Sequence, residues 1–372
     1  METVIDQKEN EDYLSSQIIT YLGNKRSLLS NIEAEINEIK KKLNSSKVVC
    51  ADLFSGSGIV SRMLKKHSSL LLANDLENYS KVINTCYLCN KRDFPEEEYD
   101  KIHDVIIQEA KKERRPGIIA ENYAPKDDNN IRPGERVFYT RKNAELLDTY
   151  RILIDEFAPE SMQAFFLAPL LSQASIHVNT SGVFKGFYKN PDTGLGCFGG
   201  KGKNALSRIL GQVELQKPLF SNFTSESRIC QMDAEAFASE EKGIDIAYLD
   251  PPYNQHPYGS NYFMLNLLLK NKIDCDLSRV SGITSNWNRS NYNKPYAALK
   301  TLEKVIEKLD AKFIIISYNS EGFISMEEMK EMLVKYGKLS TKEIPYSTFK
   351  GSRNLRERSL KVNEYLFILE KN

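Results

Sequence analysis

Short apolar runs of strand length recur along the chain, and segments with helical periodicity separate them. Continuously apolar runs are typical of strands that are buried on both faces of a parallel sheet. The predicted strands lie at residues 47–54, 70–73, 227–233, 244–249 and 313–318, followed by two terminal strands near 342–347 and 364–370. Strands that alternate with helices predict an α/β fold built on a doubly wound sheet.

Apolar residues at helical spacing predict helices between these strands. The predicted helices are residues 28–43, a helix that starts at residue 59, the apolar stripes of residues 143–178, and residues 262–268 and 296–309. Ser325 and Glu328 form a capping box, which predicts a further helix that ends at Gly337.

The chain has 372 residues, which is longer than one typical domain and predicts a large core with an insertion. The parallel pattern stops near residue 78, residues 91–134 are strongly charged, and residues 181–211 are rich in glycine. The predicted organisation is a flexible N-terminus at 1–15, a first part of the sheet domain at 16–87, a helical and glycine-rich insertion at 88–224, and the rest of the sheet domain at 225–372.

Composition changes this picture little. Hydrophobic residues make up 41% and charged residues 27%, and the net charge of +1 means that binding to nucleic acid would need local basic patches. No run approaches the roughly 20 apolar residues that span a bilayer, and the polar N-terminus is no signal peptide, so we expect a cytoplasmic protein without membrane contact. The six cysteines include one isolated C-x-x-C, at Cys86 and Cys89, and packed thiols are favoured over a metal site.

The apolar run at residues 244–249 ends abruptly at Asp250-Pro251-Pro252-Tyr253. Proline has no N–H group and a fixed φ, so these residues form a stiff turn at the carboxyl end of the strand. An exocyclic amine has two N–H donors, which the Asp250 carboxylate and a neighbouring carbonyl could accept while Tyr253 stacks on the base. The alternative is a plain turn with an exposed acid and an exposed aromatic ring.

A glycine-rich turn, Ser55-Gly56-Ser57-Gly58, joins the first strand to a helix, as at the nucleotide-binding corner of a doubly wound fold. The third glycine of a dinucleotide fingerprint and a Walker lysine are both missing, which favours an uncharged adenosyl group over a phosphate. Asp75, after the second strand, is suited to accept hydrogen bonds from ribose hydroxyls, with Glu77 as the alternative. Asp233 would lie near an adenine amine.

Upstream, Gly23 could let the backbone approach a ligand while Lys25 reaches the carboxylate of that ligand. The start of an ordinary helix is an equally good interpretation of this segment.

Basic and polar side chains gather in three segments that could contact nucleic acid. They are Lys185, Lys189, Lys201 and Lys203 in the glycine-rich stretch, Asn286 and Arg289 in a polar aromatic loop, and Lys350, Arg353, Arg356 and Arg358 between the two terminal strands. A disordered surface loop and a solvated hairpin are the alternatives for the first and third segments.

Four motifs, in this order, resemble those of Dam-like N6-adenine DNA methyltransferases of the α group. They are Tyr21-Leu22-Gly23-Asn24-Lys25, Asp52-Leu53-Phe54-Ser55-Gly56-Ser57-Gly58, Asn74-Asp75 and Asp250-Pro251-Pro252-Tyr253. Residues 318–322 and 364–367 are similar to later strands of the modification enzymes of restriction systems. One departure is Asn24, because many relatives have glycine there.

The resemblance implies a Rossmann-like, S-adenosylmethionine-dependent methyltransferase sheet. Tyr21 and Lys25 would contact the cofactor, the segment from Asp52 through Phe54, Ser55 and Gly56 to Gly58 would form its pocket, and Asp75 would hold its ribose. Asp250, Pro251, Pro252 and Tyr253 would carry a flipped adenine. The insertion at 88–224 would include the target-recognition region, between a cofactor-binding part at 16–87 and a catalytic part at 225–372.

The expected function is therefore site-specific methylation of adenine N6 in double-stranded DNA, as the modification enzyme of a restriction system. A cognate restriction endonuclease would act on the same site without forming a stable complex. An RNA adenine methyltransferase and a non-catalytic DNA-binding protein on the same scaffold are the alternatives. Cytosine N4 enzymes more often have serine at the position of Asp250, and glutamine methyltransferases have asparagine there.

Overall fold

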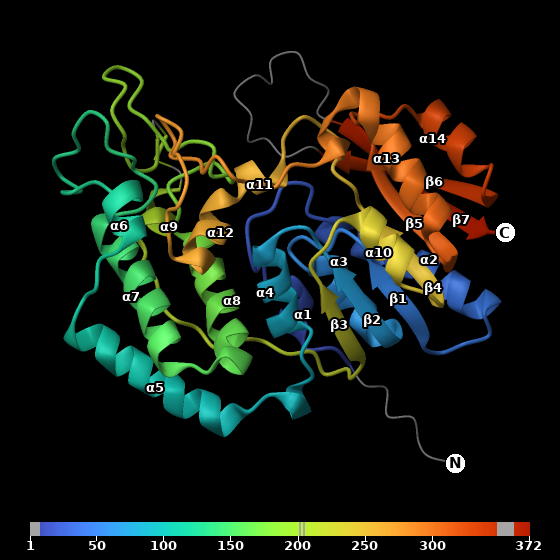
Figure 1. Ribbon diagram of the computed structural model, residues 1–372, viewed down its shortest axis with the longest axis horizontal. Helices are drawn as coiled ribbons and strands as arrows, with labels where there is room; N and C mark the ends of the chain where they lie inside the picture. The colour runs from blue at the N-terminus through green and yellow to red at the C-terminus, as the bar shows by residue number, and fades with distance from the viewer. Residues whose placement is uncertain (1–7, 201, 204, 348–360) are drawn as a thin grey trace.

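A single seven-stranded sheet organises the computed structural model, which describes residues 8–200, 202–203, 205–347 and 361–372 (Figure 1). The strands are β1 Val48–Asp52, β2 Ser68–Asn74, β3 Glu226–Cys230, β4 Ile244–Leu249, β5 Ala311–Asn319, β6 Gly337–Ser347 and β7 Lys361–Lys371. All seven predicted strands are therefore confirmed. β3 ends three residues before Asp233, which instead caps the following helix.

The strand order is β3-β2-β1-β4-β5-β7-β6, and only β7 runs antiparallel to its neighbours. The order reverses between β1 and β4, where Asp52 pairs with Tyr248. The carboxyl ends of β1, β2, β3 and β4 consequently meet along one edge of the sheet, the usual place for a ligand in such folds. The predicted α/β, Rossmann-like class is confirmed.

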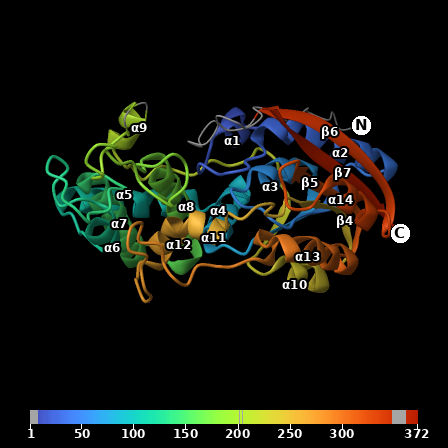
Figure 2. The ribbon, with the colours of Figure 1, turned by 90° about the horizontal axis from the view of Figure 1, so that it is seen from above.

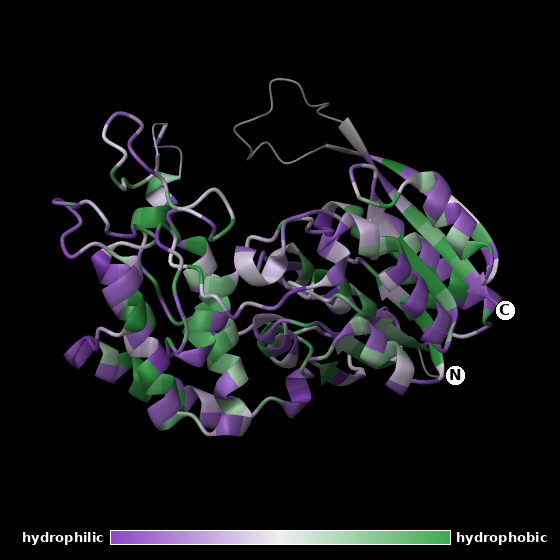
Figure 3. Ribbon diagram, turned by 45° about the horizontal axis from the view of Figure 1, so that its top comes forward, coloured by the Kyte–Doolittle hydropathy of each residue, from purple (hydrophilic) through white to green (hydrophobic). Residues whose placement is uncertain are grey.

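Helices cover both faces of the sheet and make three layers (Figure 2). On one face, α2 Leu29–Lys42 contributes Ile32, Ile36 and Ile39 to a shared core with α3 Ile59–Leu64. The helices on the opposite face are α10 Ala234–Glu240, α13 Pro295–Lys308 and α14 Met326–Leu333. Figure 3 shows the apolar residues concentrated on the strands between these layers, which explains why the strand sequences are continuously apolar.

The helix after the capping box is shorter than predicted. Ser325 and Glu328 form the box, but α14 ends at Leu333, and Gly337 starts β6 rather than ending the helix. A Cβ atom added at Gly337 would lie 2.0 Å from the backbone oxygen of Glu370. Glycine is thus needed there for the close approach of two strands, not for a helix end.

The N-terminal segment is also more ordered than its polarity predicts. α1 Glu11–Ser15 buries Tyr13 completely, and the Tyr13 hydroxyl donates a hydrogen bond to the backbone oxygen of Tyr87, at 2.5 Å. The Arg62 guanidinium donates to the backbone oxygens of Tyr13 and Ser16. Residues 8–15 are therefore anchored to the sheet domain.

A helical lobe lies beside the sheet and is inserted between α4 and β3 (Figure 1). Its helices are α5 Glu96–Lys112, α6 Ile118–Tyr123, α7 Arg141–Phe157, α8 Glu160–Ile176 and α9 Leu206–Leu210. The helices α5 to α8 share one apolar core with α4 Asn78–Tyr87 and α12 Phe263–Lys270. The buried helices predicted at 143–178 are confirmed. Among the described residues, no helix has the length and apolar character needed to cross a membrane.

Short elements complete the described chain. They are α11 Tyr258–Asn261 and the 3-10 helices η1 Arg26–Leu28, η2 Lys65–His67, η3 Lys91–Asp93 and η4 Asn291–Asn293.

Candidate active site

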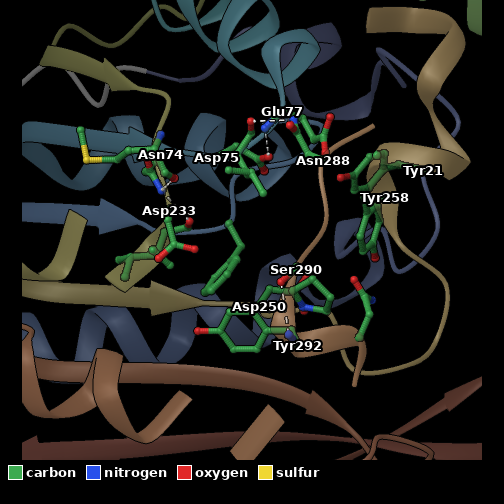
Figure 4. Close-up of a pocket in the computed structure, with 18 residues that line it drawn as sticks. Tyr21, Asn74, Asp75, Glu77, Asp233, Asp250, Tyr258, Asn288, Ser290 and Tyr292 are labelled. Atoms are coloured by element: carbon green, nitrogen blue, oxygen red, sulfur yellow. Dashed lines mark hydrogen bonds between the residues drawn. The ribbon is translucent and has the colours of Figure 1, made fainter. Parts of the chain in front are cut away.

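A cavity opens at the carboxyl ends of β1, β2, β3 and β4, where the strand order reverses. The residues that line it, drawn in Figure 4, are Tyr21, Leu53, Phe54, Asn74, Asp75, Leu76, Glu77, Met232, Asp233, Ala234, Asp250, Pro252, Tyr258, Gly259, Asn288, Ser290, Tyr292 and Asn293. Leu53 and Phe54, which directly precede the glycine corner, thus line the same cavity as Asp250 and Pro252 of the predicted turn.

Tyr21 forms one wall of the cavity and is fixed by other tyrosines. Its ring stacks on those of Tyr258 and Tyr262, with centroid distances of 5.0 and 4.8 Å. Its hydroxyl lies 3.1 Å from that of Tyr79. The sequence predicted Tyr21 as a cofactor contact. It did not indicate which aromatic residues would support the Tyr21 ring.

The glycine corner shapes the cavity from behind. Gly56 has a φ of +50°, and a Cβ atom added there would lie 2.7 Å from the Tyr21 ring. Gly58, with a φ of +76°, precedes α3. Ser55 donates to the backbone oxygen of Asn74, at 3.0 Å. These three residues do not line the cavity themselves; they bring β1, β2 and Tyr21 close together.

Asp75 lines the cavity after β2 and also holds the glycine corner. Its Oδ2 accepts a hydrogen bond from the Gly56 N–H at 2.8 Å, and its Oδ1 accepts one from the Glu77 N–H at 2.9 Å. Burial raises the pKa of Asp75 to about 6, although these N–H groups oppose the shift. Each oxygen keeps further lone-pair capacity, so Asp75 can still accept hydrogen bonds from a ligand.

Glu77 is the more buried acid of the pair and accepts a 2.6 Å hydrogen bond from Asn266 of α12. Burial, followed by the neighbouring charge of Asp75, raises the pKa of Glu77 to about 7. The two acids that sequence reasoning offered as alternatives therefore line the cavity together.

Asp233 is exposed at the far side of the cavity from Tyr21 (Figure 4). Its Oδ1 accepts a 2.8 Å hydrogen bond from the Glu235 N–H at the start of α10. Phe54, which also lines the cavity, packs edge-to-face on Tyr292, with a centroid distance of 5.3 Å. This region combines a flat apolar surface with a carboxylate acceptor, which suits a purine ring that bears an amine.

Asp52 does not line the cavity. It is buried beneath it, where its Oδ2 accepts a 2.6 Å hydrogen bond from the Ser61 hydroxyl. Burial raises its pKa to about 7. The side chain predicted to contact the cofactor is thus directed at α3.

Asp250 closes the end of the cavity next to β4. Its Oδ1 lies 3.0 Å from the Nζ of Lys25, which also lies 3.0 Å from Oε1 of Glu364 on β7. The side chains of Lys25 and Glu364 are 5% and 4% exposed, whereas that of Asp250 is 21% exposed. Burial raises the pKa of Asp250 to about 6, and Lys25 opposes this rise.

Lys25 is not among the residues that line the cavity. Its ammonium group contacts two carboxylates of the protein itself, and its contact with the carboxylate of a ligand stays a prediction. Burial lowers the pKa of Lys25, but the charges of Asp250 and Glu364 outweigh burial and raise it well above its ordinary value. Glu364 was missed as a site residue because its sequence context is that of an ordinary terminal strand.

The Asp250-Pro251-Pro252-Tyr253 turn presents groups in two directions. Asp250 and Pro252 line the cavity, whereas Tyr253 does not. The Tyr253 ring packs edge-to-face on Tyr318, with a centroid distance of 6.3 Å, and its backbone oxygen accepts a 3.0 Å hydrogen bond from the Phe323 N–H. The turn thus stands between the cavity and a separate region around Gly23, whose added Cβ atom would lie 3.7 Å from the Tyr253 hydroxyl.

None of the predicted nucleic-acid contacts that the structure describes lines the cavity itself. Lys185 is half-buried, and Lys189 and Lys203 are exposed, in the glycine-rich segment. Asn286 and Arg289 are exposed on the loop that leads to the cavity-lining Asn288. Lys201, Lys350, Arg353, Arg356 and Arg358 lie outside the described residues.

The glycine-rich segment has a defined conformation. The Asn179 side chain donates hydrogen bonds to the backbone oxygens of Val137 and Cys197 and accepts one from the Gly199 N–H. Arg208 donates to the backbone oxygens of Val178 and Thr180 and is therefore structural. On the second loop, the Arg289 guanidinium stacks on Trp287, 4.3 Å from the ring centroid.

Comparisons with known proteins agree with this geometry. Residues 21–332 match the family described as D12 class N6 adenine-specific DNA methyltransferase. The chain is 31% identical over 361 residues to the Type II methyltransferase M.NlaIII of Neisseria lactamica, a match that covers 95% of this chain and 99% of that protein.

Two further relatives are similar over most of the chain. It is 28% identical to the Type II methyltransferase M.CviAII of Paramecium bursaria Chlorella virus 1, covering 94% of this chain and 98% of the relative. It is 27% identical to the Type II methyltransferase M.FokI of Planomicrobium okeanokoites, covering 95% of this chain and 52% of that longer protein.

Gly56→Ala should weaken binding of S-adenosylmethionine, because the new methyl group would displace Tyr21 from the cavity wall. Alanine is also strained in the left-handed backbone conformation of this position, so the substitution should lower the free energy of unfolding by about 1–2 kcal/mol. Calorimetric titration and urea unfolding measure the two effects. Gly243→Ala is the control: its φ is +72° but open space surrounds it, so it should lose stability without losing affinity. Equal reductions of affinity in both variants would contradict the role of Gly56.

Lys25→Met should lower the free energy of unfolding by about 3 kcal/mol, because it leaves two buried carboxylates without their shared partner. Urea unfolding measures this decrease. Lys41→Met removes a lysine whose pair with Glu38 is largely exposed and should leave stability nearly unchanged. If both variants were as stable as the parent protein, the buried ion pairs would not be a structural requirement.

Proposed function

Because the chain belongs to the family of D12 class N6 adenine-specific DNA methyltransferases, we propose that its cavity binds the cofactor beside a flipped adenine held at the Asp250 turn. The protein is an S-adenosylmethionine-dependent DNA adenine methyltransferase. S-adenosylmethionine supplies an electrophilic methyl group on a sulfonium centre. The residues of this chain would bind the cofactor, orient the target amine and recognise the DNA.

The lining of the cavity suits the separate parts of the cofactor. Phe54 and Tyr292 offer a flat apolar surface for the adenine ring, and Asp233 can accept from its amine. Asp75 can accept from the ribose hydroxyls, with Glu77 beside it. Tyr21 encloses the remaining side of the cavity. Lys25 contributes indirectly, through its contact with Asp250.

The Asp250 turn suits the target amine. The observation that carries the proposal is that Asp250 lines the same cavity as Asp75 and Asp233, while Lys25 engages only one of its two oxygens. The free oxygen and the Pro251 carbonyl can accept the two N–H groups of the amine, while Tyr253 stacks on the base and Pro252 keeps the turn stiff. The amine lone pair then faces the methyl group.

Transfer needs no covalent link to the protein. The N–C bond would form as the C–S bond breaks, with the C–S electron pair remaining on sulfur, and the positive charge that develops on N6 would lie next to the Asp250 carboxylate. By holding the amine in line with the methyl group, the Asp250 turn would supply much of the rate enhancement in such a step. The proton that N6 loses would pass to the Asp250 carboxylate and from there to water.

The basic segments are proposed to contact the DNA backbone. Lys185, Lys189 and Lys203 lie in the insertion at 88–224, which we assign to target recognition, and Asn286 and Arg289 lie on the loop beside the cavity. Arg289 stacked on Trp287 offers both a cation and a flat ring. We extend the proposal to Lys201, Lys350, Arg353, Arg356 and Arg358 on the sequence alone.

The biological setting is proposed from the relatives and the motif order. Type II methyltransferases are among the relatives, so a restriction endonuclease that cuts the same DNA sequence is the expected counterpart. It would share the DNA site and form no stable complex with this chain. The cofactor motifs precede the insertion and the Asp250 motif follows it, which fits the Dam-like α group.

Asp250→Ala should abolish methyl transfer to DNA adenine while S-adenosylmethionine still binds, because Asp75, Asp233 and Tyr21 remain in place. Tritium transfer from labelled cofactor measures the first property and calorimetry the second. A parallel assay on RNA of matched sequence tests the choice of substrate. Substantial turnover by Asp250→Ala would refute the role of this residue.

Replacing both Lys189 and Arg289 by alanine should weaken DNA binding and reduce the slope of log K against log salt concentration, by about 0.9 for each phosphate that the variant no longer neutralises. Fluorescence anisotropy over a salt series measures this slope. Lys312→Ala is the matched control, because this exposed lysine lies at the opposite, amino-terminal edge of the sheet. An unchanged slope in the double variant would remove these residues from the DNA interface.

A further inference from the structure

Glu364 is a buried carboxylate with three partners. Its Oε1 accepts a 2.7 Å hydrogen bond from the Ser317 hydroxyl and lies 3.0 Å from the Nζ of Lys25. Its Oε2 accepts a 3.1 Å hydrogen bond from the Asn319 amide. Ser317 and Asn319 both belong to β5, whose antiparallel pairing with β7 places Glu364 directly opposite Asn319. Two donors from the sheet therefore fix the carboxylate in one position.

Lys25 connects this fixed carboxylate to Asp250. An ammonium group has three N–H donors, and here two of them face Glu364 Oε1 and Asp250 Oδ1, each at 3.0 Å. The side chain is 5% exposed, so water offers little competition for these contacts. A lysine with only one carboxylate partner could rotate about its flexible stem and approach either oxygen of Asp250. With Glu364 in place, its position is determined from both sides.

Asp250 is consequently left with unequal oxygens. Oδ1 is taken by Lys25, and among the described residues this is the one ion pair of the Asp250 carboxylate. The side chain retains 21% exposure and lines the cavity, so the second oxygen stays available to a ligand.

We propose that Glu364 is a positioning residue for methyl transfer: it holds Lys25 on one oxygen of Asp250 and so leaves the other oxygen aimed at the target amine. The inference rests on the proposed role of Asp250. It assigns a task to a residue 114 positions farther along the chain that contacts neither the cofactor cavity nor the Asp250 turn directly. Glu364 acts through Lys25.

A net negative charge also follows from this arrangement. Two carboxylates share one ammonium group, so the charge of Glu364 contributes to the raised pKa of Asp250, which is about 6 and is due first to burial. The other titratable groups that act on Asp250, or on the groups packed around it, are Lys25, Asp52, Tyr248, Tyr253, Tyr258 and Glu321. Removal of the Glu364 charge should lower the pKa of Asp250.

Glu364→Gln is the test, because it removes the charge and keeps the shape. We expect kcat to fall by about tenfold to a hundredfold, since a reacting group that is less well placed reduces the rate by this order. KM values for DNA and S-adenosylmethionine should change less than about twofold, because the cavity lining is untouched. In the parent protein we expect kcat/KM to fall below about pH 6, because the raised pKa of Asp250 is reached there, and in Glu364→Gln this acid limb should move to lower pH.

Two further variants separate positioning from stability. Glu370→Gln makes the same change on the same strand, at an exposed residue paired with Lys42, and should leave kcat and the pH profile unchanged. Glu364→Asp keeps the negative charge but shortens the side chain by one methylene, which moves the carboxylate away from Lys25. We therefore expect kcat to fall while the acid limb of kcat/KM stays near pH 6. This variant also carries the test if Glu364→Gln does not fold, as judged by urea unfolding.

The outcomes distinguish the inference from its premise. An unchanged kcat and an unchanged acid limb in folded Glu364→Gln would overturn the positioning role. An effect confined to KM or to the unfolding midpoint would do the same. Turnover by Asp250→Ala would instead overturn the role of Asp250 itself, whatever Glu364→Gln shows.

Discussion

One buried ammonium group ties the structure together. Lys25 lies between α1 and α2, Asp250 follows β4, and Glu364 lies on β7. Burial of any one of these three charged groups without its partners would cost free energy, so the arrangement is favourable only when Lys25, Asp250 and Glu364 are in contact. The N-terminal segment is therefore fixed to the sheet beside the turn that we propose to hold the reacting amine. Folding and the geometry of the site depend on the same contacts.

The sheet topology decides where this contact can form. Strand order reverses between β1 and β4, so α3, which follows β1, and α13, which precedes β5, cover opposite faces, and a space remains between the strand ends. Phe54 and Asp250 emerge on either side of that space. Gly56 lets Tyr21 close it, because any side chain at this position would meet the Tyr21 ring. The cavity results from topology, and its lining from a few short turns.

Much of the fold could be predicted from sequence, since strands buried on both faces must be continuously apolar and each ended at a polar turn. The Asp250 turn, Asp75 and Asp233 were found in this way. The partners of Lys25 could not be found, because periodicity identifies elements but not which distant carboxylate an ammonium group will meet. The helix end at Leu333 was missed for a similar reason: the close approach of β6 to β7 that Gly337 permits depends on a strand far along the chain.

The helical lobe raises a different question, namely how an insertion of this size is kept in register with the cavity. Asn266, on α12 of the lobe core, donates to Glu77 at 2.6 Å and accepts from the Tyr79 N–H at 3.0 Å. The backbone of Leu22 is likewise bound on both sides, since its N–H donates to the Tyr262 hydroxyl and its oxygen accepts from that of Tyr258. These contacts join the lobe to a cavity-lining acid and to the segment that carries Tyr21 and Lys25. Because they are short and directional, a shift of the lobe would move the cavity wall with it, so the DNA recognition that we propose for the lobe and the cofactor binding that we propose for the cavity would share one boundary.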